Sequence, residues 1–126
     1  MPTAFVTGAT GFVGSHIALH LLRQGWNVVA IRRENSVNPY LPPGEIDWRL
    51  CDIRDADRLV KVMEGCEAVF HVAADYRLWA RNPREIYASN VAGTDNVLRA
   101  ARLCQVRRVV YTSSVGALGH HLDGTP

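Results

Sequence analysis

Short apolar runs, separated by polar or glycine-rich stretches, recur along the chain and predict five β-strands. Each run is four to six residues long. Residues 28–31 form an unbroken apolar run, which is typical of a strand buried on both faces of a sheet. The predicted strands are residues 4–7, 28–31, 46–51, 68–72 and 109–112.

Three other segments have the apolar spacing of helices. The first places Val13, Ile17 and Leu21 on one face and ends near Gly25, a residue suited to the end of a helix. The other two helices are expected at residues 56–63 and 84–103.

The order of these elements predicts the fold class. A helix follows the first, third and fourth strands, whereas a proline-rich loop at residues 34–45 joins the second to the third. This alternation predicts an α/β fold with a mainly parallel sheet and right-handed crossovers.

Composition narrows the class of protein. The chain has 126 residues, 48% of them hydrophobic and 21% charged, as expected of one globular domain. Fourteen Lys and Arg against 12 Asp and Glu give no electrostatic argument for nucleic acid or an anionic membrane as a partner. The three cysteines are far apart and lack metal-ligand spacing, which favours reduced, buried thiols. With no signal peptide and no apolar run of spanning length, a cytoplasmic location is expected.

Glycines occur every third residue where the first strand turns into the first helix. Gly8, Gly11 and Gly14 have the spacing GxxGxxG, and Thr10, Phe12 and Val13 lie between them. Backbone without side chains lets a pyrophosphate approach closely, and the helix N-terminus favours its negative charge. This position between strand and helix therefore predicts a dinucleotide-binding turn.

The end of the second strand bears on the choice of dinucleotide. NAD-binding sites usually place an acidic residue there for the ribose 2′-hydroxyl, whereas this chain has Arg32 and Arg33, followed by Glu34. Guanidinium groups suit a 2′-phosphate, so NADP is expected and NAD is the less favoured choice. The alternative is that both arginines are solvated and that Glu34 serves NAD.

The chain resembles the extended short-chain dehydrogenase/reductases, the NAD(P)-dependent epimerase/dehydratase group. Within that group it is most similar to the hopanoid-associated sugar epimerase branch, which is related to dihydroflavonol reductases. The matching segments are TGATGFVGSHIALHLL (7–22), Asp52-Ile53, FHVAAD (70–75), Asn90-Val91 with Gly93-Thr94, and VYTSS (110–114), with HVAADYRLWARNPREIYASNV (71–91) for the branch.

The resemblance implies a Rossmann-type doubly wound parallel sheet with strand order 3-2-1-4-5. It also implies an NAD(P) site, a small-molecule substrate such as a sugar nucleotide or a related hydroxyl or carbonyl compound, and a homodimer. Ser114 and Asn90 match the family's catalytic serine and supporting asparagine. The implied cofactor-binding residues are Gly8, Thr10, Gly11, Phe12, Val13, Gly14, Arg32, Arg33, Asp52, Ile53, Val72, Ala73, Ala74 and Thr112. Among them, the resemblance implies that Asp52 and Ile53 contact the adenine.

Several of these residues have simpler roles open to them. Asp52 could cap the following helix, Asn90 could be a solvated helix residue, and the hydroxyls of residues 112–114 could bond the backbone. Tyr76 and Trp79 follow the fourth strand, where they could face a substrate or only pack. His16 and His20 lie four residues apart but lack an HExxH pattern, which favours a structural role.

The family's Tyr-x-x-x-Lys pair does not occur in this sequence. The only lysine is Lys61, and the residue four positions before it is Asp57. In the family that pair lies beyond the fifth strand. We therefore expect residues 1–126 to be the N-terminal part of a Rossmann domain, without the later strands, the Tyr-Lys helix or the substrate domain. The expected function is NADP(H) binding without catalysis by this part alone; the alternative is a non-catalytic NADP-binding sensor or regulatory module.

Overall fold

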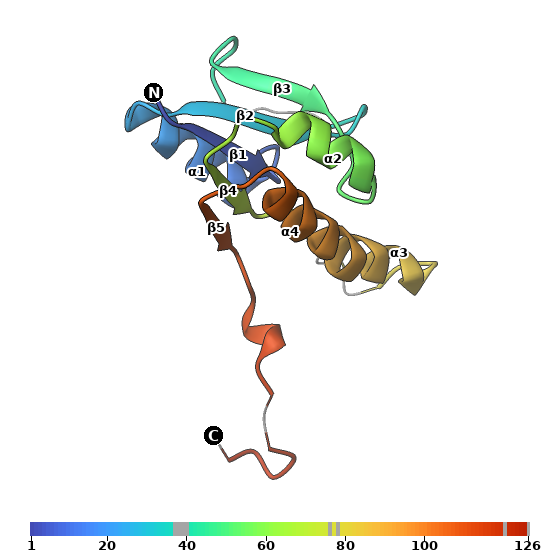
Figure 1. Ribbon diagram of the computed structural model, residues 1–126. Coiled ribbons are helices and arrows are strands. Elements are labelled where there is room, and N and C mark those ends of the chain that lie inside the picture. Colours follow the sequence, from blue (N-terminus) through green and yellow to red (C-terminus); the bar gives the residue numbers. More distant parts are fainter. Residues whose placement is uncertain (37–40, 76, 78, 120, 126) are drawn as a thin grey trace.

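The computed structural model describes residues 1–36, 41–75, 77, 79–119 and 121–125. Within these residues the chain forms a five-stranded sheet in the order β3-β2-β1-β4-β5, and every neighbouring pair is parallel (Figure 1). The predicted Rossmann-type order is therefore confirmed. The strands are β1 (Thr3–Thr7), β2 (Asn27–Arg32), β3 (Ile46–Leu50), β4 (Ala68–His71) and β5 (Arg108–Tyr111).

Helices cover both faces of the sheet. Helix α1 packs on β1 and β2, while α2 and α4 pack against each other on the opposite face (Figure 1). None of the helices described combines the length and apolarity needed to cross a bilayer. The helices are α1 (Phe12–Arg23), α2 (Ala56–Met63), α3 (Pro83–Tyr87), the π-helix η1 (Ala88–Ala92), α4 (Gly93–Leu103) and the 3-10 helix η2 (Val115–Ala117).

The alternation of side chains along the central strands builds two cores. In β1, Ala4 and Val6 pack under α1, whereas Phe5 joins Leu59 and Val97 on the side of α2 and α4. All five side chains are fully buried. Burial on both faces explains why the strand sequences are continuous apolar runs.

The helix expected at residues 84–103 begins one residue earlier and is not uniform. Asn82 caps it, with its side-chain oxygen accepting from the backbone N–H of Arg84 at 3.1 Å. Between α3 and α4 the backbone widens into η1, and its dihedral angles stay helical across both junctions. Short π-helical segments occur often at functional sites. The hydrophobic pattern gave no indication of this one, because a single wide turn hardly alters the helical period.

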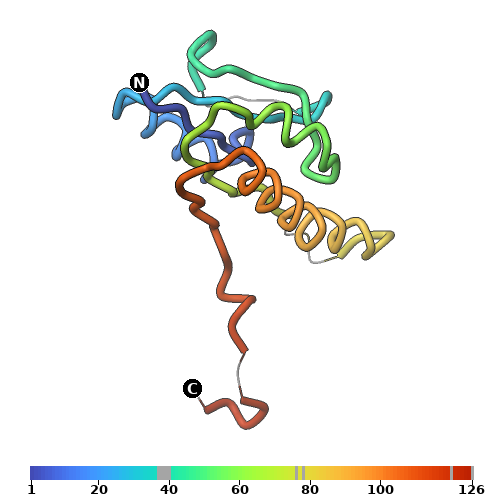
Figure 2. The backbone as a smooth tube through the Cα atoms, viewed as in Figure 1, coloured from blue at the N-terminus to red at the C-terminus, as the bar shows by residue number. Residues whose placement is uncertain are grey.

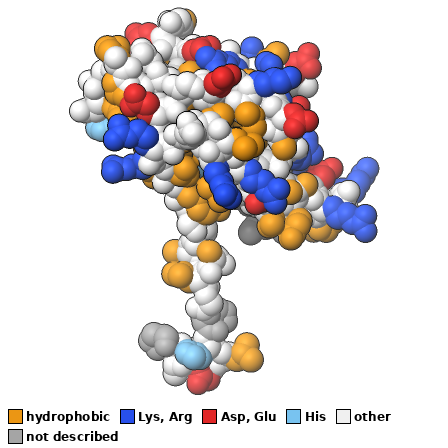
Figure 3. Space-filling view, viewed as in Figure 1, with side chains coloured by type: hydrophobic (Ala, Val, Ile, Leu, Met, Phe, Trp, Pro, Cys, Tyr) orange, Lys and Arg blue, Asp and Glu red, His pale blue; other side chains and the backbone are white. Residues whose placement is uncertain are grey.

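The edge of the sheet at β5 is open to solvent. Val109, Val110 and Tyr111 are between 37% and 53% exposed. Beyond β5 the chain runs away from the body as an extended segment (Figures 1 and 2). Hydrophobic side chains gather where this segment leaves the body and along it (Figure 3), where Val115 and Leu118 are exposed.

Leu59→Ala tests the core beneath α2. Leu59 is fully buried, so the variant should lower the free energy of unfolding by about 2–5 kcal/mol. Leu103→Ala is the matched control, because Leu103 is 70% exposed and its truncation should change stability by only about 0.5 kcal/mol. Urea unfolding of both variants measures the difference, and equal effects would contradict this account of the core.

Candidate functional site

The glycine-rich turn brings three stretches of backbone into contact. Gly8 has a φ of +73°, and a Cβ added there would lie 2.7 Å from the backbone nitrogen of Ala73. A Cβ at Gly14 would lie 2.0 Å from the carbonyl oxygen of Gly8. Both positions therefore require glycine, because a side chain at either one would clash with neighbouring backbone. Gly11 has no such clash, because its nearest neighbour would be at 3.4 Å.

The start of α1 presents its backbone to solvent. Gly11 is the N-cap and has no side chain with which to satisfy the first N–H groups of the helix. Phe12 and Val13, the first two helical residues, are 69% and 49% exposed. The carbonyl of Phe12 points inward and accepts from the Ser15 hydroxyl at 2.9 Å. Open N–H groups at a helix N-terminus suit an anionic group such as a phosphate.

A buried hydrogen-bond network fixes the turn to the neighbouring strand. The Thr7 Oγ1 atom accepts from the backbone N–H groups of Val72 and Ala73, both at 3.0 Å. The same oxygen lies 2.7 Å from Nδ1 of His71, and Nε2 of His71 lies 2.8 Å from the Thr94 hydroxyl. The network therefore joins the carboxyl ends of β1 and β4 to helix α4.

His71 lies at the centre of this network and is fully buried. Its ring stacks on Tyr111, with centroids 5.5 Å apart and planes 14° from parallel. Burial lowers the pKa of His71 to about 4, because the charged imidazolium would lose its hydration. His71 is therefore neutral at physiological pH.

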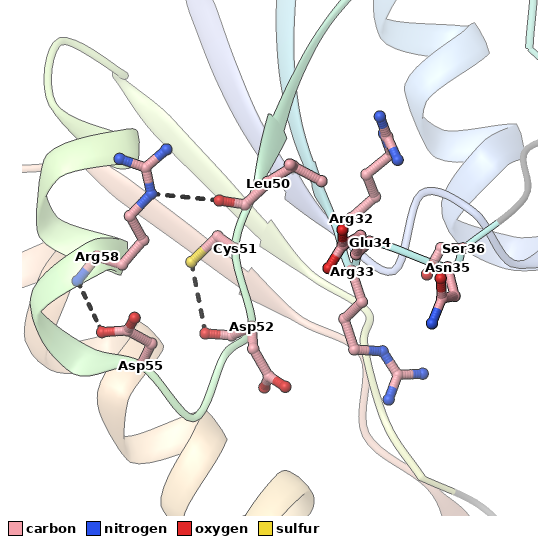
Figure 4. Close-up of a pocket in the computed structure, with 10 residues that line it drawn as sticks. All are labelled: Arg32, Arg33, Glu34, Asn35, Ser36, Leu50, Cys51, Asp52, Asp55 and Arg58. Carbon is pink, nitrogen blue, oxygen red and sulfur yellow. Dashed lines mark hydrogen bonds between the residues drawn. The ribbon is translucent and has the colours of Figure 1, made fainter.

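A pocket of about 640 Å³ opens beside the ends of β2 and β3. Arg32, Arg33 and Glu34 line it from β2 and the loop that follows, and Leu50 to Asp52 line it from β3 (Figure 4). The side chains of Arg32 and Arg33 point to opposite sides of the strand end (Figure 4). Arg58 also lines the pocket, as do the carboxylates of Glu34, Asp52 and Asp55. Arg32 and Arg33 lie at the position where the sequence predicted the 2′-phosphate.

Asp52 forms a salt bridge within its own turn. Its carboxylate accepts from the backbone N–H of Arg54 at 2.9 Å, and Nη2 of Arg54 lies 2.8 Å from the second oxygen. Hydrogen bonding to Arg54 lowers the pKa of Asp52, with a smaller contribution from the charge of Arg33. The alternative that Asp52 caps α2 is wrong, because Asp55 is the N-cap and accepts from Arg58 at 3.1 Å. Asp52 stays available at the rim of the pocket, and its contact with adenine stays a prediction.

Ile53 belongs to the core. It is 9% exposed, and a Cβ at Gly93 would lie 2.7 Å from its Cδ1 atom. The Asn96 side chain donates to the Ile53 carbonyl at 3.0 Å, which ties the turn to α4. Ile53 is not one of the described residues that line the pocket. Its predicted contact with adenine remains untested.

Asn90 forms two hydrogen bonds to the backbone of the segment that follows β4. Its Oδ1 accepts from the backbone N–H of Asp75 at 2.7 Å, and its Nδ2 donates to the Asp75 carbonyl at 2.7 Å. The Asp75 side chain pairs with Arg77, which lowers the pKa of Asp75. Asn90 is thus not a solvated helix residue. It joins η1 to residues 72–75, where Val72, Ala73 and Ala74 were expected to pass the cofactor.

The structure does not bring the two predicted catalytic residues together. Ser114 is exposed in the segment after β5, and its hydroxyl oxygen accepts from the backbone N–H of Gly116 at 3.1 Å. The Thr112 N–H donates to the His71 carbonyl at 3.0 Å. Trp79 is 78% exposed, whereas Tyr76 lies outside the described residues.

The cysteines are free thiols. Cys51 and Cys66 are buried, and burial raises the pKa of each to about 11. Such thiols are inert at neutral pH. Among the described residues, no three His, Cys, Asp or Glu side chains are grouped as a metal site would require.

A turn without side chains, an open helix N-terminus and a pocket with two arginines at the end of β2 are together typical of a nucleotide-binding Rossmann sheet. Comparison with known families agrees, since residues 4–126 match the model of the "NAD dependent epimerase/dehydratase family". The chain belongs to this family.

Its relatives include reductases and epimerases. The chain is 48% identical over 120 residues to a putative dihydroflavonol 4-reductase of Synechocystis, covering 95% of this chain and 35% of the relative. It is 36% identical over 122 residues to sterol demethylase protein B of Methylococcus capsulatus, covering 97% and 37%. The crystal structure of UDP-glucose 4-epimerase from Brucella ovis in complex with NAD superposes with a TM-score of 0.82 at 31% identity, covering 97% and 39%. The chain therefore spans little more than a third of the length of these relatives.

Sequence reasoning missed the network of Thr7, His71 and Thr94. A signal was present, because Thr7 and His71 end strands that the predicted order makes neighbours, and the register pairs them directly. The bond between Arg54 and Asp52 had no comparable signal, since a turn with three charged residues, Asp52, Arg54 and Asp55, allows several pairings.

Gly14→Ala should distort the turn. The added methyl group would lie 2.0 Å from the Gly8 carbonyl oxygen, so backbone must shift at a cost of about 1–3 kcal/mol. Gly119→Ala is the control, since nothing lies within 4 Å of its Cβ position. Thermal and urea unfolding should separate the two variants. If Gly14→Ala is as stable as Gly119→Ala, the close approach is not as described.

Acid should weaken the fold through His71. Its pKa is about 4 in the folded chain against an ordinary 6.5, so its contribution is complete above pH 6.5 and is lost as the pH falls towards 4. His71→Asn lacks this titration and should show a flatter stability curve across that window. The unfolding free energies of both chains at several pH values measure the difference, and parallel curves would contradict the prediction.

Proposed function

We propose that this chain binds NADP(H), with the pyrophosphate on the glycine-rich turn and the 2′-phosphate beside Arg32 and Arg33. The observation that carries the proposal is the position of these two arginines, which line a pocket at the end of β2. A guanidinium group offers paired, charged donors that match phosphate oxygens. The neighbouring carboxylate of Asp52 is already paired with Arg54, which limits its competition for the arginines.

The preference for NADP over NAD is the finer part of the proposal. A solved relative, the Brucella ovis epimerase, is described with NAD, so the fold accommodates the dinucleotide without a 2′-phosphate. The acidic residue after the arginines, Glu34, also lines the pocket and offers a ribose hydroxyl an acceptor. Three arginines and three carboxylates line the pocket. Asp52 is paired with Arg54, Asp55 caps α2, and Arg58 donates to the Leu50 carbonyl. Of the charges that remain, the two arginines at the end of β2 outnumber Glu34, which favours the phosphorylated ribose.

For the whole protein we propose hydride chemistry on a hydroxyl or carbonyl group of a small molecule such as a sugar nucleotide. Support comes from relatives whose names include reductases and epimerases. Within residues 1–126, no tyrosine is followed four positions later by a lysine. We therefore propose that this chain supplies nucleotide binding, with Ser114 as a substrate-side hydroxyl, and that proton transfer requires residues it does not contain. A homodimer is proposed for the whole protein.

Titration with NADPH and NADH tests the proposed preference. Trp26, Trp48 and Trp79 provide intrinsic fluorescence, and NADPH should bind more tightly than NADH. Arg32→Ser should weaken NADPH binding about tenfold, because a charged hydrogen bond contributes about 1.5–3 kcal/mol. Binding of NADH should hardly change in the same variant.

Arg107→Ser is the matched control, because it removes the same charge from an exposed position at the entry to β5. Its affinity for both nucleotides should equal that of the unaltered chain. Equal or tighter binding of NADH by the unaltered chain would overturn the preference for NADP. Failure to bind either nucleotide would overturn the proposed function.

A further inference from the structure

The Thr7 hydroxyl has three partners, and only one arrangement of protons satisfies them all. Its oxygen accepts from the N–H groups of Val72 and Ala73, which occupies both lone pairs of a hydroxyl. The third partner, Nδ1 of His71 at 2.7 Å, must therefore accept the Thr7 proton.

The same count of donors and lone pairs determines the tautomer of the His71 ring. A nitrogen that accepts a proton carries none of its own, so the single proton of the neutral ring is on Nε2. From there it is donated to the Thr94 hydroxyl at 2.8 Å. With a proton on Nδ1 instead, Thr7 would have three donors for two lone pairs, and one donor would be left unpaired in a buried site.

We infer that His71, neutral and protonated on Nε2, is a positioning residue for the nucleotide site, which it orders by accepting the Thr7 proton, so that the lone pairs of the Thr7 oxygen face the N–H groups of Val72 and Ala73. This inference rests on the proposed nucleotide-binding function. His71 is buried and has no contact with solvent, so it acts through Thr7 and not on a ligand directly.

The geometry at Gly8 explains why this orientation matters for binding. The Ala73 nitrogen that donates to Thr7 is the atom that a Cβ on Gly8 would meet at 2.7 Å. The hydrogen bond from Ala73 to Thr7 thus holds the glycine-rich turn against the end of β4, so close that no side chain fits between Gly8 and Ala73. Thr94 attaches the same ring to α4, and Tyr111 stacks on it from β5. The place of the turn is therefore determined by four elements that meet at His71.

Nitrogen-15 NMR of the chain labelled at histidine tests the proton assignment without any nucleotide. The chain has five histidines, and the signals of His71 are identified by their loss in His71→Asn. At neutral pH, Nδ1 of His71 should be unprotonated and Nε2 protonated, as one tautomer. A ring protonated on Nδ1, charged, or averaging between both tautomers would overturn the inference.

Substitutions at Thr7 test the effect on binding. Thr7→Val keeps the shape but removes the oxygen, and should weaken NADPH binding about tenfold or more, because two N–H groups lose their acceptor. Thr7→Ser retains the oxygen and should restore most of the affinity. Thr3→Val makes the same change at the opposite end of β1 and should leave the affinity unaltered.

The outcomes separate the inference from the proposed function. Binding of NADPH by the unaltered chain together with equal binding by Thr7→Val would overturn the positioning role and leave the function intact. Absence of binding by the unaltered chain would overturn the function, and with it the role in binding, while the NMR result would still decide the proton assignment. If Thr7→Val does not fold, Thr7→Ser and the NMR measurement decide: loss of affinity in a folded Thr7→Ser would contradict the inference.

Discussion

The close approach of the glycine-rich turn to the end of β4 is the constraint on which the site depends. A Cβ at Gly8 would reach the Ala73 nitrogen, and one at Gly14 would reach the Gly8 carbonyl. Because no side chain separates these segments, the first turn of α1 begins directly above the carboxyl edge of the sheet. An anion at that edge meets backbone N–H groups rather than side chains. The rest of the fold, two buried cores on either side of β1, keeps this edge in place.

Much of this arrangement follows from the order and composition of the strands. The unbroken apolar run at residues 28–31 predicted that β2 is buried on both faces, and the alternation of strands with helices predicted the parallel order of the sheet. The glycine spacing then located the turn, because only backbone can approach so closely. Even the contact between Thr7 and His71 follows in principle, since both residues end neighbouring strands. These features depend on periodicity and topology, which sequence patterns record directly.

The choice of hydrogen-bond partners is less predictable. The sequence alone offers both Asp52 and Asp55 as N-caps of α2. In the structure Asp55 is the cap, whereas Asp52 forms a salt bridge with Arg54. The wide turn around Asn90 likewise has no signature in the hydrophobic period, although it sets where that side chain meets Asp75. Which partner each of these side chains reaches depends on small differences in the local backbone dihedral angles. Several pairings of polar residues are nearly equal in energy, so local sequence does not select between them.

The carboxyl edge of the sheet therefore has two unlike parts. Between β1 and β4 it is buried and uncharged, and Thr7 and His71 satisfy each other's polar atoms there. Between β2 and β3 it is open and charged, with Arg33 and Glu34 exposed. Substitutions at exposed positions usually change stability little, whereas an unpaired polar atom in the buried part is costly. Substitutions at the residues proposed to contact the ribose can thus be made without disturbing those that hold the turn. The proposed determinants of nucleotide preference and the contacts that fix the fold are separable because they occupy different strands of one edge.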